Sequence, residues 1–144
     1  MPQVGVGGVV IHRGRVLLVL RGHEPLKGQW SIPGGLVEVG ERLEKAVSRE
    51  LKEETGLVVE PVKIIKVFDR IERVCRRVRY HFVIVDYYCL LKRGKLKPAS
   101  DVLDARWARR DELSRFGLTE MARDVILEAF RFAEKRPKTG LRAV

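Results

Sequence analysis

The chain has 144 residues, a length typical of one domain and sufficient to bury a core without disulfides or a structural metal. Apolar residues make up 45% and charged residues 33%, proportions that exclude a disordered chain. With 29 Lys and Arg against 19 Asp and Glu, the net charge of +10 favours polyanions of any kind, whether nucleotides, pyrophosphates or RNA.

The sequence carries no sign of membrane insertion or export. No apolar run reaches the roughly 18 residues that a transmembrane helix needs, and the first residues lack the features of a signal peptide. A cytoplasmic protein is therefore expected. The chain also has 19 Arg, no Asn and only two Gln, Gln3 and Gln29. Few thermolabile amides together with many charges favour a thermophilic source.

The N-terminal third predicts short strands. Residues 4–12 are rich in Val and Gly and alternate, which predicts a strand, and residues 16–20 predict a second one. The turn at residues 13–15 joins them into a hairpin. A polar loop follows at residues 22–29, and a short strand is expected at residues 30–32. The segment Pro33-Gly34-Gly35 then predicts a bend that interrupts regular structure.

A helix is predicted over residues 41–55. Its apolar residues recur with the period of one helix face, and Gly56 is a natural stop because it can adopt a left-handed conformation. The apolar residues of this face are Leu43, Ala46, Val47 and Leu51.

Residues 58–71 and 78–91 are β-branched and aromatic, and they predict a long two-stranded ribbon with a charged turn near residues 73–77. Residues 103–108 predict one more short strand. Thr119 is a suitable N-cap for a closing helix that continues to about Arg136. Two helices on a mixed sheet indicate an α/β or α+β fold in layers. We assign residues 1–136 to a single domain and expect residues 137–144 to form a loose tail.

Acidic residues occupy an unusual place on the helix at residues 41–55. On a wheel of 100° per residue, Glu54 lies 40° from Glu50, and Glu53 lies 60° away on the other side. Glu50 and Glu54 therefore share the face of the buried apolar residues, where a surface helix has no carboxylates. Mutual repulsion and the helix dipole both oppose this cluster. A hard divalent cation such as Mg²⁺, which prefers oxygen ligands, would resolve the conflict.

The residues around this cluster form a longer pattern. Gly35, Glu41, Arg49-Glu50-Leu51, Glu53-Glu54 and Gly56-Leu57 match all nine fixed positions of a 23-residue motif, Gx5Ex7REUxEExGU, in which U is apolar. This motif resembles the Nudix box, and the order of the elements around it also resembles the Nudix α/β/α sandwich. The chain is therefore identified as a member of the Nudix hydrolases, similar to the MutT-like and ADP-ribose pyrophosphatase-like proteins.

The resemblance implies a role for each residue of the box. Glu50, Glu53 and Glu54 correspond to the metal ligands, with support from Glu41 and from the backbone carbonyl of Gly35. Arg49 corresponds to the residue that orients the glutamates. The implied cofactor is Mg²⁺, for which Mn²⁺ can substitute. The ions bridge the diphosphate and lower the pKa of a bound water, and an acidic residue takes the proton.

The general base is left open between two regions. Glu53 is the first choice, and the alternatives are Asp101, Asp104 and Glu112, which flank Trp107. Arg21, together with Gly34 and Gly35, is expected to bind substrate. Arg21 ends the second strand, where some relatives have a phosphate-binding arginine.

The implied reaction cleaves a nucleoside diphosphate linked to another group, and ADP-ribose or another ADP-sugar is the first candidate. One departure counts against ADP-ribose, because Glu72 and Arg73 stand about where that subgroup has a proline. Alternatives are a nucleoside triphosphate, including an oxidised one, a dinucleoside polyphosphate, or a non-catalytic nucleotide-binding regulator.

Other residues are assigned by their local context. Trp30 and Trp107 are interpreted as packing residues, and the arginines of residues 70–79 as the solvated tip of a hairpin rather than a grip for RNA. Nucleic acid is therefore not the expected partner. Cys75 and Cys89 lack the spacing of a zinc site and are interpreted as reduced thiols, with a disulfide as the alternative. The family resemblance and the long ribbon favour a homodimer.

Overall fold

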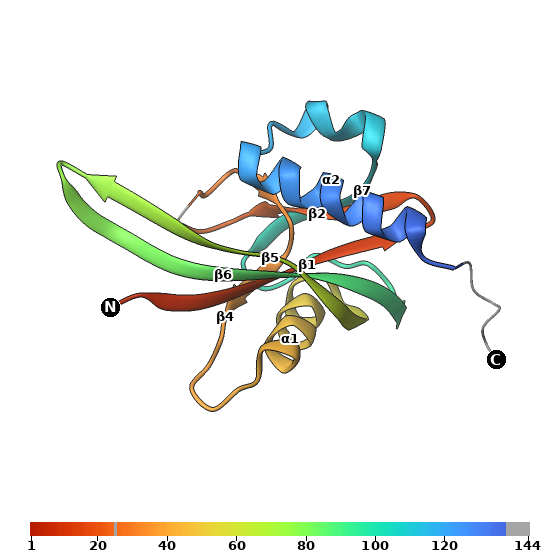
Figure 1. The fold of residues 1–144 in the computed structure, drawn as a ribbon, viewed down its shortest axis with the longest axis horizontal. Coiled ribbons are helices and arrows are strands. Elements are labelled where there is room, and N and C mark those ends of the chain that lie inside the picture. The colour runs from red at the N-terminus through yellow and green to blue at the C-terminus, as the bar shows by residue number, and fades with distance from the viewer. Residues whose placement is uncertain (25, 138–144) are drawn as a thin grey trace.

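The computed structural model describes residues 1–24 and 26–137 (Figure 1). Apart from Pro137, the expected C-terminal tail lies outside the described residues. Within the described part of the chain, no helix has the length and apolar character needed to cross a bilayer.

A mixed sheet forms the centre of the fold, as predicted. Its strands are β1 (Gln3–His12), β2 (Arg15–Arg21), β3 (Trp30–Ser31), β4 (Gly34–Leu36), β5 (Leu57–Val74), β6 (Arg77–Gly94) and β7 (Val102–Arg109). β1 runs parallel to β6 and antiparallel to both β4 and β2. β2 in turn pairs with β3 and β7. The predicted hairpin, ribbon and late short strand are therefore confirmed.

Two helices cover opposite faces of this sheet, which confirms the layered sandwich (Figure 1). α1 (Leu43–Thr55) buries Ala46, Val47 and Leu51 in one core cluster, and Gly56 ends it at a φ of 78°. α2 (Glu120–Lys135) packs into the second cluster with its buried residues Val125, Ile126, Ala129 and Phe130. The Thr119 hydroxyl accepts a hydrogen bond from the Ala122 amide at 3.2 Å, so Thr119 is the N-cap, as expected.

Two local predictions are wrong, and one element was not predicted. α1 begins at Leu43 rather than at residue 41, so Glu41 precedes the helix. Gly34–Leu36 is the strand β4 rather than a bend, because its backbone pairs with residues 5–7 of β1. A 3₁₀ helix, η1 (Arg110–Phe116), which the sequence patterns did not predict, follows β7.

The cysteines form no disulfide with each other. Cys75 is exposed at the turn of the ribbon, whereas Cys89 is buried in β6, where burial raises the pKa of its thiol. The interpretation as two free thiols is confirmed.

The ribbon of β5 and β6 extends beyond the rest of the sheet (Figure 1), and β5 is its edge strand. Val67 is 56% exposed on β5, and Ile64, Ile71 and Val74 are also exposed. A long apolar edge favours pairing with another chain.

We therefore expect the protein to be a dimer in sedimentation equilibrium. Val67→Lys should shift the equilibrium toward monomer, whereas Lys66→Arg should not. A wild-type protein that sediments as a monomer would contradict this expectation.

Candidate active site

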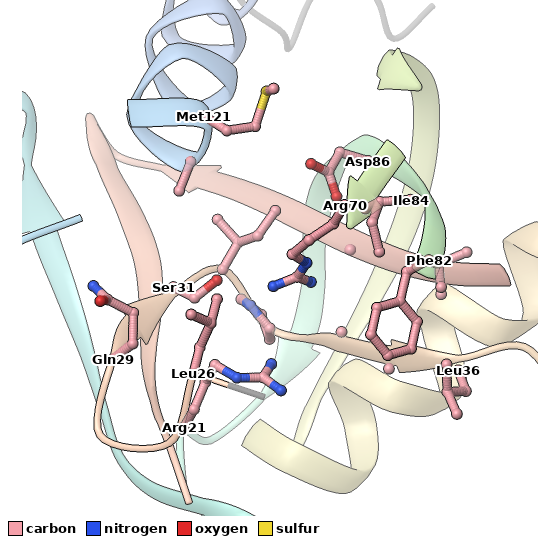
Figure 2. Close-up of a pocket in the computed structure, with 18 of the residues that line it drawn as sticks. Arg21, Leu26, Gln29, Ser31, Leu36, Arg70, Phe82, Ile84, Asp86 and Met121 are labelled. Atoms are coloured by element: carbon pink, nitrogen blue, oxygen red, sulfur yellow. The ribbon is translucent and has the colours of Figure 1, made fainter. Parts of the chain in front are cut away.

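One large cavity of about 740 Å³ lies where β1, β4 and the ends of β2 and β6 meet the N-terminus of α2. Both Glu50 and Glu54 line it, together with Gly34 and Gly35. Figure 2 shows Arg21 and Arg70 extending into this cavity from different strands, with Met121 of α2 at its rim.

Glu54 is the most buried acid of the motif, at 6% exposure. Its Oε1 accepts a hydrogen bond from the Gly34 amide at 3.1 Å, which joins the end of α1 to β4. Burial raises the pKa of Glu54 to about 8, although the Gly34 amide opposes the shift, and the negative charges of Glu50 and Asp101 add to it. The site therefore holds a carboxyl group that ionises at higher pH than an ordinary glutamate, although the charge of Arg21 also opposes the shift.

Glu50 lies against the backbone of Gly35. A Cβ atom at Gly35 would overlap the Glu50 carboxyl group, so the motif glycine allows this side chain to approach β4. Burial raises the pKa of Glu50, and Arg49 partly offsets the shift. Glu50 and Glu54 thus belong to the same cavity, as the helical period predicted.

Arg49 connects the remaining acids. Its Nε lies 2.7 Å from Glu41 Oε2, and its Nη1 lies 3.1 Å from Glu50 and 3.3 Å from Glu53. Its Nη2 donates to the Leu36 carbonyl at 3.1 Å. Hydrogen bonding to Arg49, and then to the Glu38 amide, lowers the pKa of Glu41 to about 2. Arg49 can therefore fix the positions of Glu41, Glu50 and Glu53 together.

The donor set has the chemistry that a hard cation requires, namely carboxylate oxygens beside backbone carbonyls. In the described part of the chain, however, no group of three or more acidic, His or Cys side chains is gathered closely enough to hold an ion. Glu50 and Glu53 bond to Arg49, whereas Glu54 bonds to the Gly34 amide. An ion would therefore compete with Arg49 for two of these carboxylates.

Arg21 lines the cavity at the end of β2. Burial lowers its pKa, and the negative charges of Glu54, Glu24 and Asp101 oppose this shift. The guanidinium thus stands among acidic groups and can contact an anion that enters the same space.

The three late candidates for the base lie in different surroundings. Asp101 lines the cavity, with its Oδ2 3.6 Å from His23. Asp104 accepts the Ala105 amide and pairs with Arg106 at 3.1 Å, whereas Glu112 caps η1 by accepting the Arg109 amide. Neither Asp104 nor Glu112 is among the described residues that line the cavity.

Two further charged residues of the cavity were missed at the sequence level. Asp86 of β6 is 4% exposed, although it stands in an otherwise apolar run. Arg70 of β5 lines the cavity with a buried Nε, so its interpretation as part of a solvated tip is wrong. Arg73, Arg76, Arg77 and Arg79 are exposed, in agreement with that interpretation. A single acid within a β-branched strand was the signal that could have identified Asp86.

The predicted packing of both tryptophans agrees with the structure. Trp30 meets Phe116 edge to face at 5.1 Å while also lining the cavity, and Trp107 packs against the core cluster beneath α1.

Comparisons with known proteins agree with this fold and motif. An ADP-ribose pyrophosphatase of Methanocaldococcus jannaschii is 35% identical over 106 residues, which cover 74% of this chain and 61% of that protein. A mouse 8-oxo-dGDP phosphatase is 35% identical over 98 residues, 68% of this chain and 29% of its own length. The chain thus spans less than two thirds of these curated relatives.

A solved structure extends the match over nearly all of another chain. The MutT NUDIX hydrolase of Burkholderia pseudomallei is 30% identical and superposes with a TM-score of 0.78 over 89% of this chain and 98% of its own. The NUDIX domain pattern itself matches residues 1–130. This chain therefore belongs to the NUDIX domain family.

Proposed function

We propose that this protein is a Mg²⁺-dependent hydrolase that cleaves the phosphoanhydride bond of a nucleoside diphosphate linked to another group. The main support for this proposal is that Glu54 is buried beside Glu50 and the backbone of β4. The cavity that these residues line is large enough for a nucleotide. The negative charge of Glu50 adds to the cost of ionising the buried Glu54, and a bound divalent ion would offset this cost.

ADP-ribose or another ADP-sugar is the first candidate substrate. The similarity to an ADP-ribose pyrophosphatase supports this choice. A nucleoside triphosphate or an oxidised nucleotide is the second candidate, supported by the similarity to an 8-oxo-dGDP phosphatase.

In this proposal Glu50, Glu53 and Glu54 hold Mg²⁺ or Mn²⁺, with Glu41 and the Gly35 carbonyl in support. A bound ion would supply an activated water and would offset negative charge on the leaving phosphate. Arg49 orients the carboxylates, and Arg21 contacts the diphosphate where it enters beside Gly34. Glu53 is 51% exposed and is not among the described residues that line the cavity, and it would accept the proton from the water; Asp101, which lines the cavity, is the alternative base.

A panel of substrates tests this function. With Mg²⁺, we expect release of AMP from ADP-ribose, and we expect Glu53→Gln to lower the rate strongly. ADP-glucose, dNTPs, 8-oxo-dGTP and a dinucleoside polyphosphate complete the panel, and Glu128→Gln on the exposed face of α2 is the matched control. Absence of metal-dependent hydrolysis across the panel, or a Glu53→Gln protein as active as wild type, would refute the proposal.

The raised pKa of Glu54 makes metal binding depend on pH. In the metal-free protein, the protonated Glu54 carboxyl group contributes to the stability of the fold. This contribution is fully present below the ordinary pKa of 4.5 and is lost as the pH rises through about 8. The pKa of Glu50 shifts in the same direction. Because Mg²⁺ binds the ionised form, it must displace a proton at lower pH.

We therefore expect Mg²⁺ to raise the unfolding temperature more at about pH 9 than at about pH 6. Differential scanning fluorimetry measures this difference between unfolding temperatures with Mg²⁺ and with EDTA, which gives the metal-free reference. Glu54→Gln should lose most of the pH dependence. Equal Mg²⁺-induced shifts at the two pH values would argue against binding at Glu54.

A further inference from the structure

The Asp86 carboxyl group is buried in the cavity wall without a partner. Asp86 is 4% exposed and lines the cavity on β6, between Val85 and Tyr87, which face the opposite core cluster. Among the described residues, no group forms a hydrogen bond or ion pair with its carboxyl oxygens, and these oxygens are not sealed from the cavity. These oxygens can therefore accept hydrogen bonds from a molecule in the cavity.

The surrounding chain accommodates this group at a cost to stability. A Cβ atom at Gly7, the neighbour of Asp86 on β1, would overlap Asp86 Oδ1 and lie 3.0 Å from Ile32 Cδ1. Burial raises the pKa of Asp86 to about 7, and the charge of Arg70 partly opposes the shift. A buried, unpaired carboxyl group destabilises a fold, so its presence in a cavity indicates a role in binding.

Arg70 supplies the complementary group. It lies on β5 opposite Phe82, with its guanidinium 5.8 Å from the centre of the Phe82 ring. Its buried Nε has no hydrogen-bond partner in the described residues. Asp86 and Arg70 attract each other but form no direct ion pair within the described chain. The side chains of Asp86 and Arg70 thus both line the cavity (Figure 2).

The walls around this pair are apolar. Ile32, Phe82, Ile84 and Met121 line the same cavity as the pair. A flat aromatic ring with polar atoms along one edge matches such a space better than a sugar, whose hydroxyl groups point in all directions. Amino groups of bases pair with carboxylates, and ring nitrogens or carbonyl oxygens pair with arginine.

We propose that Asp86 and Arg70 form the site that recognises the base of the substrate. Asp86 accepts a hydrogen bond from the amino group of a purine, and Arg70 donates to the neighbouring ring nitrogen or carbonyl oxygen. This inference rests on the proposed function, because it assigns the base to Asp86 and Arg70 and the diphosphate to the part of the cavity lined by Glu50 and Glu54.

Titration calorimetry with product nucleotides tests the role of Asp86 without any hydrolysis. AMP and purine riboside 5′-monophosphate differ only in the 6-amino group, and GMP and IMP differ only in the 2-amino group. We expect wild type to prefer the amino-bearing member of at least one pair by roughly tenfold, the value of a hydrogen bond to a charged group. Asp86→Leu should abolish that preference, and Asp86→Asn should retain part of it.

The Arg70 variant has a different expected signature. Arg70→Met should lower the affinity for both nucleotides of a pair by a similar factor, because both nucleotides carry the acceptor that Arg70 contacts. Arg73→Met removes the same charge from an exposed position of β5 and should change neither affinity, and Asp124→Leu on the exposed face of α2 is the control for Asp86→Leu. Asp86→Leu should unfold at the wild-type temperature or above, because it removes an unpaired buried acid.

The inference is overturned if wild type prefers neither amino-bearing nucleotide, or if the preference survives in Asp86→Leu. It is also overturned if ribose 5-phosphate competes with AMP in wild type but not in Asp86→Leu, since Asp86 would then bind the sugar. Wild type that binds AMP as expected but hydrolyses no substrate would instead refute the proposed function alone.

Discussion

Glu54→Gln is expected to lower kcat by roughly 10²–10⁴-fold, since a metal ion contributes several kcal/mol to the transition state and each 1.4 kcal/mol is a factor of ten. Gln keeps the size of Glu54 and can still accept the Gly34 amide, which lies 3.1 Å away. It cannot supply the negative charge that a divalent ion requires. Steady-state kinetics at saturating Mg²⁺ measure this loss.

The unfolding temperature of Glu54→Gln distinguishes a loss of catalysis from misfolding. Because burial raises the pKa of Glu54 to about 8, the ionised carboxyl group destabilises the metal-free protein. Glu54→Gln should therefore unfold at the wild-type temperature or above when EDTA is present. A variant that is both well folded and fully active would show that Glu54 does not take part in the reaction.

Arg49→Lys should lower kcat/KM and the affinity for Mn²⁺ by roughly 10–100-fold, the range seen when a residue that orients metal ligands is lost. Arg49 reaches Glu41, Glu50, Glu53 and the Leu36 carbonyl at once. A lysine ammonium is a single point charge and cannot reproduce the fork of a guanidinium. Kinetics and calorimetric titration with Mn²⁺ measure the two effects.

Arg131→Lys on the exposed face of α2 is the matched control and should behave as wild type. If Arg49→Lys retained wild-type Mn²⁺ affinity, the carboxylates would hold their positions without the guanidinium, and Arg49 would have no positioning role.

Local patterns in the sequence predicted much of the fold. The helical period of α1 placed Glu50 and Glu54 on the buried side, because 3.6 residues per turn directly relates sequence spacing to a face. The β-branched runs predicted β5 and β6 for a similar reason. The parallel pairing of β1 with β6 joins segments more than 70 residues apart, and no local pattern carries that information.

The missed features depend on tertiary contacts. Gly34–Leu36 becomes β4 only because β1 offers a partner for its backbone, so two glycines after a proline predicted a bend instead. Arg70 belongs to the same charged segment as the exposed arginines of the tip. Only the pairing of β5 with β6, which places Arg70 beside Phe82, brings it into the cavity. Asp86 was visible as a lone acid in an apolar strand, but its neighbour Gly7 is far away in sequence.

Anomalous diffraction from crystals soaked with Mn²⁺ and a non-hydrolysable ADP-ribose analogue provides the most direct test of ion binding by the acids of α1. We expect an anomalous peak within about 2–2.5 Å of carboxylate oxygens of Glu50 and Glu54, the range for oxygen ligands of such ions. Arg49 should remain bonded to Glu41 at the same time. Density for the bound analogue without any peak beside Glu50 and Glu54 would contradict the proposed role of these residues.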